Sequence, residues 1–148
     1  PHILKDFEII FQVLNRLPEE IKRKNILIGP YENGYKGMKN IFGLYNNCEI
    51  ILANRFHSNL ASIGLEKPTI GLFNYPQIKN LYGELGLEKY LVDLNNKNLL
   101  EELKIIFNQI SKDPIKHINN FKNISKKTCQ KYDLKMMEFC KWIKKNVQ

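Results

Sequence analysis

Apolar and polar residues follow two patterns along the chain, one helical and one extended. Residues 2–17 carry apolar side chains at steps of three and four, which places them on one face of an amphipathic helix. Short apolar runs predict buried strands at 25–28, 49–53, 69–73 and 90–92. Helical spacing returns between and after these runs, at 38–46, 58–65, 77–85, 96–112 and from 114 to about 145.

Strands that alternate with helices predict a parallel sheet, because parallel strands need crossover connections. Uninterrupted apolar strands further indicate that both faces of the sheet are covered. We therefore expect one Rossmann-like α/β domain over residues 1–148, with a C-terminal helix at 114–146. Gly86 follows the helical pattern at 77–85, where a left-handed C-cap is expected.

The spacing also assigns side chains of two helices to the core. In the segment 38–46 the residues expected to face inward are Ile41, Leu44 and Tyr45. In the last helix the stripe of Met136, Phe139, Trp142 and Ile143 is more plausibly core than a cofactor site.

The composition is that of a soluble globular protein, with 43% hydrophobic and 26% charged residues. No apolar run approaches the length of a membrane span, and no secretory leader opens the chain, so we expect a cytoplasmic protein. Since the first residue is Pro1, we expect a piece of a longer protein. The three cysteines have no metal-ligand spacing and are expected to be reduced, mostly buried thiols: Cys48, Cys129 and Cys140.

The net charge of +8 is concentrated near the C-terminus. Residues 113–148 hold nine lysines against Asp113, Asp133 and Glu138. Such a segment could attract nucleic acid or anionic lipid. A solvated helix face is the simpler interpretation, and no nucleic-acid-binding motif accompanies the charge. We expect no nucleic-acid partner.

Ligands of open parallel sheets bind at the edge formed by the carboxyl ends of the strands. Three predicted loops lie at that edge: 29–34, 54–58 and 74–77. The side chains and glycines expected to line the resulting cleft are Gly29, Tyr31, Glu32, Asn74 and Tyr75.

The loop Asn54-Arg55-Phe56-His57-Ser58 carries the strongest chemical signal, since it joins a buried strand to a helix. Free N–H groups at such a helix N-terminus attract anions. Arg55 adds a planar donor pair for carboxylate or phosphate, and His57 can exchange a proton near neutral pH. From position alone an ordinary structural role is equally open, with Arg55 paired to a carboxylate and His57 capping the helix.

The stretch from Ala53 to Ile70, ANRFHSNLASIGLEKPTI, resembles the signature of the polysaccharide pyruvyl transferase family. That family shows Arg-x-His, a helix of small residues, a Gly, a Pro and an apolar strand. A later Leu-Gly is matched by Leu85-Gly86, so that the resemblance covers roughly residues 25–93.

The resemblance implies a domain similar to the C-terminal half of a two-domain GT-B fold, whose N-terminal domain is missing here. It implies an enzyme that transfers a pyruvyl group from phosphoenolpyruvate, without a cofactor or metal, to sugar hydroxyls of a cell-surface polysaccharide. By the same resemblance His57 would be catalytic, and Arg55 would bind the anionic donor, with Asn54 and Ser58 beside it. A lipid-linked saccharide acceptor would bring the protein to the membrane surface.

The chain departs from the family in the loop after the third predicted strand. Family members commonly carry a Lys after an aromatic-Asp-Pro, whereas this loop reads Asn74-Tyr75-Pro76-Gln77. Lys79 lies two residues further on and is expected to reach the same anion. The departure keeps two other functions open: a GT-B-like glycosyltransferase or epimerase domain that binds a nucleotide sugar, and a non-catalytic relative.

Overall fold

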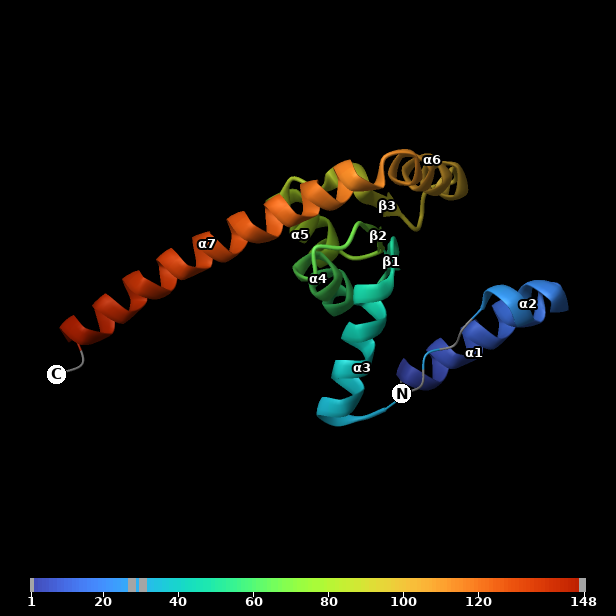
Figure 1. The fold of residues 1–148 in the computed structure, drawn as a ribbon, viewed down its shortest axis with the longest axis horizontal. Coiled ribbons are helices and arrows are strands. Elements are labelled where there is room, and N and C mark those ends of the chain that lie inside the picture. The colour runs from blue at the N-terminus through green and yellow to red at the C-terminus, as the bar shows by residue number, and fades with distance from the viewer. Residues whose placement is uncertain (1, 27–28, 30–31, 147–148) are drawn as a thin grey trace.

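The structure is a computed structural model that describes residues 2–26, 29 and 32–146. A small parallel sheet with helices on both faces forms the body of the molecule, and further helical segments extend away from it (Figure 1). The elements in chain order are α1 (His2–Asn15), α2 (Glu19–Asn25), α3 (Gly34–Asn47), β1 (Ile51–Ala53), α4 (Phe56–Gly64), β2 (Thr69–Phe73), α5 (Pro76–Leu85), the 3₁₀ turn η1 (Glu88–Tyr90), β3 (Leu91–Asp93), α6 (Leu99–Lys112) and α7 (Pro114–Asn146).

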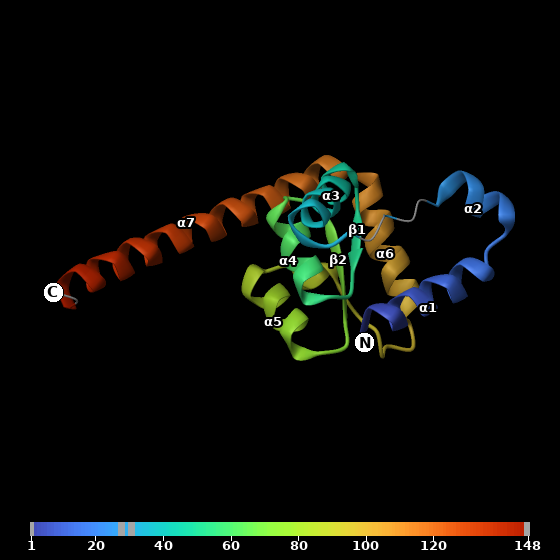
Figure 2. The same cartoon turned by 90° about the horizontal axis from the view of Figure 1, so that it is seen from below.

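The three strands are parallel and lie in the order β1-β2-β3. Ile51 pairs with Thr69 and Gly71 pairs with Leu91, so that β2 is the central strand. Helices α4 and α5 contact one face of the sheet and α6 contacts the other (Figure 2). The prediction of a Rossmann-like α/β fold is confirmed.

The hydrophobic core lies between the sheet, α5, α6 and the first half of α7. Ile70 and Val92 on the strands are fully buried, as are Ile78 of α5, Ile110 of α6 and Phe121 of α7. Burying a side chain of this size stabilises a protein by about 1.5–3 kcal/mol. The core therefore fixes the strands and the helices that begin beside them, although it involves only part of the chain.

Most predicted elements are present, with shifted ends. The strand at 69–73 and the left-handed conformation of Gly86 (φ 66°) are confirmed. The helix predicted from residue 38 begins at Gly34, so the loop expected up to residue 37 is partly helical. Of the strand predicted at 25–28, Asn25 is the last residue of α2, while Leu27 and Ile28 lie outside the described residues.

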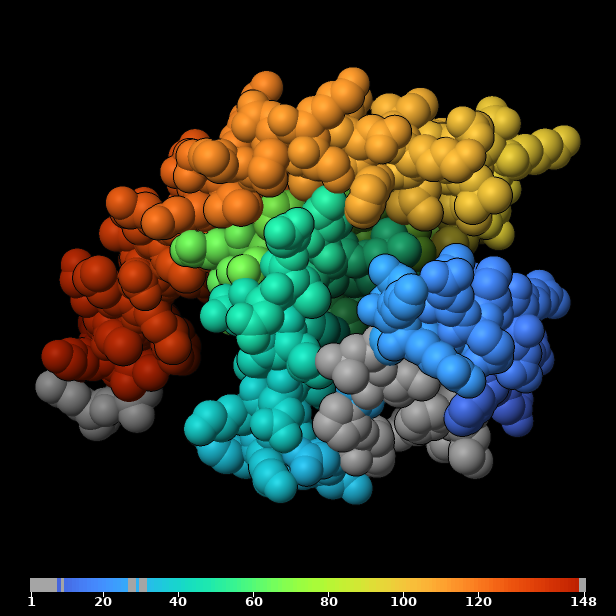
Figure 3. Space-filling view, turned by 45° about the vertical axis from the view of Figure 1, so that its right-hand side comes forward, coloured from blue at the N-terminus to red at the C-terminus, as the bar shows by residue number. Residues whose placement is uncertain are grey.

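Several apolar side chains that were assigned to the core are exposed, and for these the prediction was wrong. Ile41 and Leu44 of α3 are exposed, and so is the whole stripe of the last helix: Met136, Phe139, Trp142 and Ile143. The cysteines predicted to be mostly buried are also exposed: Cys48, Cys129 and Cys140. The physical reason is that α3 and the second half of α7 extend beyond the body, and an open gap separates the end of α7 from α3 (Figure 3).

The base of α7 is joined to the body by a polar contact between Tyr90 and His117. The Tyr90 hydroxyl lies 2.7 Å from Nδ1 of His117, and the two rings meet edge to face with centroids 5.5 Å apart. Burial lowers the pKa of His117 below its ordinary value of 6.5, and the nearby charges of Lys89 and Lys116 lower it further. Neutral imidazole can accept the hydrogen of the Tyr90 hydroxyl at Nδ1.

We expect the chain to lose stability as the pH falls below about 6.5, in part because of His117. Its pKa is lower in the folded than in the unfolded state, so the unfolded chain binds the proton first. The contribution is therefore complete above the unfolded pKa of 6.5 and is lost as the pH falls through the folded-state pKa. Denaturant unfolding at pH 5, 6 and 7 measures it. A His117→Gln variant should show a weaker pH dependence than the wild type, and equal slopes for both would refute this assignment.

Candidate active site

Two loops meet at the carboxyl edge of the sheet. Because β1 and β2 are parallel, the loop after Ala53 and the loop after Phe73 leave the sheet on the same side. Helices α4 and α5 both begin there, as Figure 2 shows. The predicted convergence of residues 54–58 and 74–77 is therefore observed in the structure.

The N-terminus of α4 presents free backbone donors at this edge. Arg55 is the N-cap in an extended conformation (φ −104°, ψ 139°), and its own side chain makes no capping hydrogen bond to this helix. The N–H groups of Phe56, His57 and Ser58 precede the first intrahelical bond, from the Asn59 N–H to the Arg55 carbonyl at 3.0 Å. No acidic residue stands in the first turn, so the positive end of the helix dipole is not neutralised within α4.

Phe56 separates the two candidate side chains and anchors the turn that carries them. Its ring is partly buried and packs against the hydrophobic core. Arg55 and His57, on either side of it, are exposed, as is Asn54, while Ser58 is partly buried. The Phe56 and His57 rings meet edge to face, with centroids 5.7 Å apart and an interplanar angle of 83°. Burial of Phe56 therefore holds its two polar neighbours at the surface.

The N-terminus of α5 adds a second positive end at the same edge. Tyr75 is its N-cap and Pro76 follows, again without an acidic residue in the first turn. Lys79 lies one turn further, with Nζ 6.0 Å from the centroid of the Phe73 ring, the last residue of β2. This distance is at the limit of a cation–π interaction. Asn74, Tyr75 and Lys79 are exposed and stay available to a ligand.

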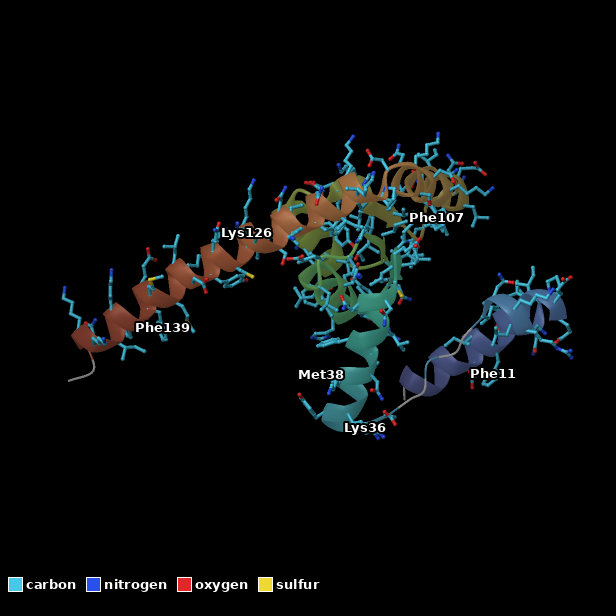
Figure 4. All side chains as sticks on the ribbon, viewed as in Figure 1. Phe11, Lys36, Met38, Phe107, Lys126 and Phe139 are labelled. Atoms are coloured by element: carbon cyan, nitrogen blue, oxygen red, sulfur yellow. The ribbon has the colours of Figure 1, made fainter. Side chains whose placement is uncertain are left out.

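The third predicted loop does not join the other two. Glu32, which precedes α3, forms an ion pair with Lys36 (3.1 Å) and a short contact with Asn40, both of them residues of that helix. Helix α3 runs away from the sheet, and its Lys36 end is the end far from β1 (Figures 1 and 4). Gly29 is exposed and lies near Leu44 of α3. Tyr31 lies outside the described residues.

Sequence reasoning missed three polar residues near this edge. Asp93 ends β3 and accepts a hydrogen bond from the Asn95 N–H at 2.8 Å, so it stabilises the turn that leads toward α6. Asn59 and Tyr82 are fully buried below the loop 54–55. Asp93 could have been found as the residue that ends the strand predicted at 90–92. Asn59 and Tyr82 could not, because a helical pattern does not say which polar residue points inward.

The amide of Asn59 connects the edge loop to α5. Its Nδ2 donates to the carbonyls of Ala53 (3.1 Å) and Arg55 (2.9 Å), and its Oδ1 accepts from the Tyr82 hydroxyl at 2.7 Å. Burial raises the pKa of Tyr82, so the hydroxyl keeps its proton as a donor. The three groups thus satisfy one another in the interior, as buried polar groups must.

The described part of the chain shows neither a metal centre nor a membrane span. Its histidines, cysteines and acidic residues form no cluster of three or more that could hold a metal ion. None of the helices within residues 2–26 and 32–146 combines the length and the apolar character needed to cross a bilayer. The arrangement at the sheet edge is instead suited to a small anion, through two helix N-termini, Arg55 and Lys79.

Comparison with known proteins identifies the family to which the chain belongs. Searches of curated proteins and of solved structures find no significant match. A family model described as polysaccharide pyruvyl transferase matches residues 2–76, half of the chain. The matched segment runs from α1 through β2 to the start of α5, and so begins and ends earlier than the resemblance traced over 25–93. It contains Arg55, His57 and the loop after β2, and the chain belongs to the polysaccharide pyruvyl transferase family.

Proposed function

We propose that this chain forms the donor-binding edge of an enzyme that transfers a pyruvyl group from phosphoenolpyruvate to two hydroxyls of a saccharide. The observation that carries the proposal is the uncapped N-terminus of α4, flanked by Arg55 and His57, in a chain of this family. Phosphoenolpyruvate carries two anionic groups, a phosphate and a carboxylate, both attached to C2. The helix N–H groups suit the phosphate, and the guanidinium of Arg55 suits either anion in a bidentate manner.

The reaction needs a general acid next to phosphoenolpyruvate. Both acceptor oxygens form bonds to C2 of the enolpyruvyl group, a proton adds to C3 to give a methyl group, and the bond from C2 to the phosphate oxygen breaks. The two hydroxyls release two protons, of which one balances C3 and the other leaves with phosphate. His57 is exposed beside the helix N-terminus and is the group assigned to proton transfer, either to C3 or to the departing phosphate.

Lys79 and the start of α5 complete the positive side of the proposed site. The loop after β2 carries Gln77 where family members commonly have Lys, and Lys79 supplies a cation one turn into the same helix. Its ammonium lies 6.0 Å from the centroid of the Phe73 ring, near the carboxyl end of β2. Lys79 would therefore bind a second oxygen of the donor phosphate, while Asn74 and Tyr75 line the opening.

The acceptor is proposed to be a saccharide of a cell-surface polysaccharide or its lipid-linked precursor, bound partly by another domain of the same protein. A cytoplasmic enzyme of this kind would meet a lipid-linked acceptor at the membrane surface, and no span is needed for that contact. The fold is proposed to correspond to the C-terminal half of a GT-B arrangement, in which a cleft between two domains receives both substrates. The Gln77 departure leaves the identity of the donor open, and the second candidate is a domain that binds a nucleotide sugar at the same edge.

Arg55→Ala is expected to remove binding of phosphoenolpyruvate without unfolding the chain. Hydrogen bonds to a charged group contribute about 1.5–3 kcal/mol, so the affinity should fall by roughly 10- to 150-fold. Because Arg55 is exposed, the melting temperature without ligand should stay near that of the wild type. Thermal shift with phosphoenolpyruvate, inorganic phosphate and a uridine diphosphate sugar measures both effects, since a ligand of the folded state raises Tm with its occupancy.

The matched control is Lys126→Ala, which removes an exposed positive charge from α7, away from the sheet edge (Figure 4). Stabilisation by phosphoenolpyruvate beyond that by phosphate, lost in Arg55→Ala and kept in Lys126→Ala, supports the proposal. Preferential stabilisation by the nucleotide sugar would replace it with the second candidate. If both variants lose the stabilisation by phosphoenolpyruvate equally, the ligand responds to the net charge of the chain and not to Arg55.

A further inference from the structure

We propose that Asn59 and Tyr82 are positioning residues, which hold the loop 54–55 in the conformation that presents Arg55 and His57 to the donor. The inference rests on the proposed function for what the loop binds. It concerns two residues that touch neither substrate nor reacting atoms. Both are buried directly behind the loop, and their hydrogen bonds connect it to α5.

The bonds of Asn59 go to the two carbonyls that flank Asn54. The Ala53 carbonyl ends β1, and the Arg55 carbonyl begins α4. One side-chain amide therefore determines how the backbone turns from strand to helix between these residues. The extended N-cap conformation of Arg55 follows from that turn, and so does the direction in which the first N–H groups of α4 point.

Tyr82 fixes the orientation of the Asn59 amide. Its hydroxyl lies 2.7 Å from Oδ1, so Oδ1 is the acceptor and Nδ2 is left to donate to both loop carbonyls. The hydroxyl is also 3.4 Å from the Thr69 carbonyl, at the start of β2. Without a donor at Oδ1, the amide loses the interaction that holds its oxygen away from the loop.

Gly71 makes this arrangement sterically accessible. A Cβ atom on Gly71 would lie 2.5 Å from Cζ of Tyr82 and 2.7 Å from its hydroxyl oxygen. The central strand thus has no side chain at the place where the Tyr82 ring crosses it to reach Asn59. An apolar residue in place of Tyr82 would fill the same core, whereas only a residue with a polar tip reaches α4 across β2.

The pair also couples the two helices that begin at the proposed site. Asn59 belongs to the first turn of α4, which carries His57, and Tyr82 lies three residues after Lys79 in α5. A change in the Asn59–Tyr82 contact should therefore alter the spacing between His57 and Lys79 as well as the loop itself. We therefore expect a substitution at Asn59 or Tyr82 to lower the affinity for the donor more than a substitution elsewhere in the core that destabilises the fold equally.

The test compares Tyr82→Phe and Asn59→Leu with a matched control, Ser62→Ala. Ser62 is as fully buried in α4, but among the described residues its hydroxyl bonds only to the carbonyls of Ser58 and Asn59, within the same helix. The first readout is hydrogen exchange of the residue 59 backbone amide, which bonds to the Arg55 carbonyl, measured relative to the amides of Ile70 and Val92. The second is the affinity for phosphoenolpyruvate and for inorganic phosphate.

In Tyr82→Phe and in Asn59→Leu we expect the backbone amide of residue 59 to exchange about tenfold faster relative to the sheet amides. This is the factor expected for the loss of one buried hydrogen bond. The affinity for phosphoenolpyruvate should fall by a similar factor, and Ser62→Ala should change neither ratio. Unchanged relative exchange in both variants, or an equal change in Ser62→Ala, would overturn the inference and leave the pair as general core packing. If the wild type binds neither probe, the proposed function fails, and the exchange ratio still decides whether the pair holds the loop.

Discussion

Replacement of His57 by glutamine is expected to lower the rate of pyruvyl transfer by about 100- to 10,000-fold, the range typical of a lost general acid or base. Glutamine can still donate and accept hydrogen bonds, but it cannot exchange a proton near neutral pH. Because His57 is exposed, its removal should leave the stability of the fold nearly unchanged. Steady-state kinetics of the full-length enzyme, with thermal melts of the same samples, measure both quantities.

The matched control is His117→Gln. His117 carries the same imidazole, but it packs against Tyr90 at the base of α7, away from the loop that carries His57. Its replacement should affect stability and leave the turnover number unchanged. A His57→Gln enzyme whose kcat is intact and whose KM alone rises would show that His57 binds the donor and does not transfer a proton.

Phe121→Ala is expected to destabilise the chain by about 3–5 kcal/mol, the usual range for a fully buried phenylalanine. The Phe121 ring is completely buried, and its centroid lies 4.9 Å from that of Tyr90. It is the main apolar anchor by which the first half of α7 packs on the body. For a chain of this length the melting temperature should fall by roughly 10–20 °C.

Phe139→Ala provides the comparison within the same helix. Its ring is 53% exposed and stacks on Trp142, with centroids 6.3 Å apart. Thermal melts of the isolated chain should show a shift below about 2 °C for this variant, as for most exposed positions. A large loss of stability in Phe139→Ala would mean that the second half of α7 is covered in solution, contrary to the structure.

The body of the fold could be predicted because its strands are short and mostly apolar. Residues 69–73 form β2 as predicted, since a strand buried on both faces shows no polar alternation to confuse the pattern. Gly86 was predictable from chain chemistry alone, because a left-handed C-cap favours glycine. The position of Arg55 and His57 could be predicted in the same way, because they lie in a short polar segment between an apolar strand pattern and a helical pattern.

Apolar periodicity misled the assignment of the projecting helices. Phe139 and Trp142 are three residues apart, as are Phe121 and Ile124, which pack on the body, yet Phe139 and Trp142 lie beyond the body and are exposed. Spacing reports which residues share a face of a helix, and it does not report what lies against that face. The same holds for Ile41 and Leu44 of α3.

The amino-acid sequence by itself determined the parallel α/β class, the family and the position of Arg55 and His57 between a strand and a helix, because these depend on local patterns of neighbouring residues. Only the tertiary structure decided which loops meet. It brought Lys79 to the edge beside β2, separated Glu32 from it at the far end of α3, and placed Asn59 against Tyr82 behind the loop. Those contacts join residues distant along the chain, and their geometry is set by how the helices pack across the sheet.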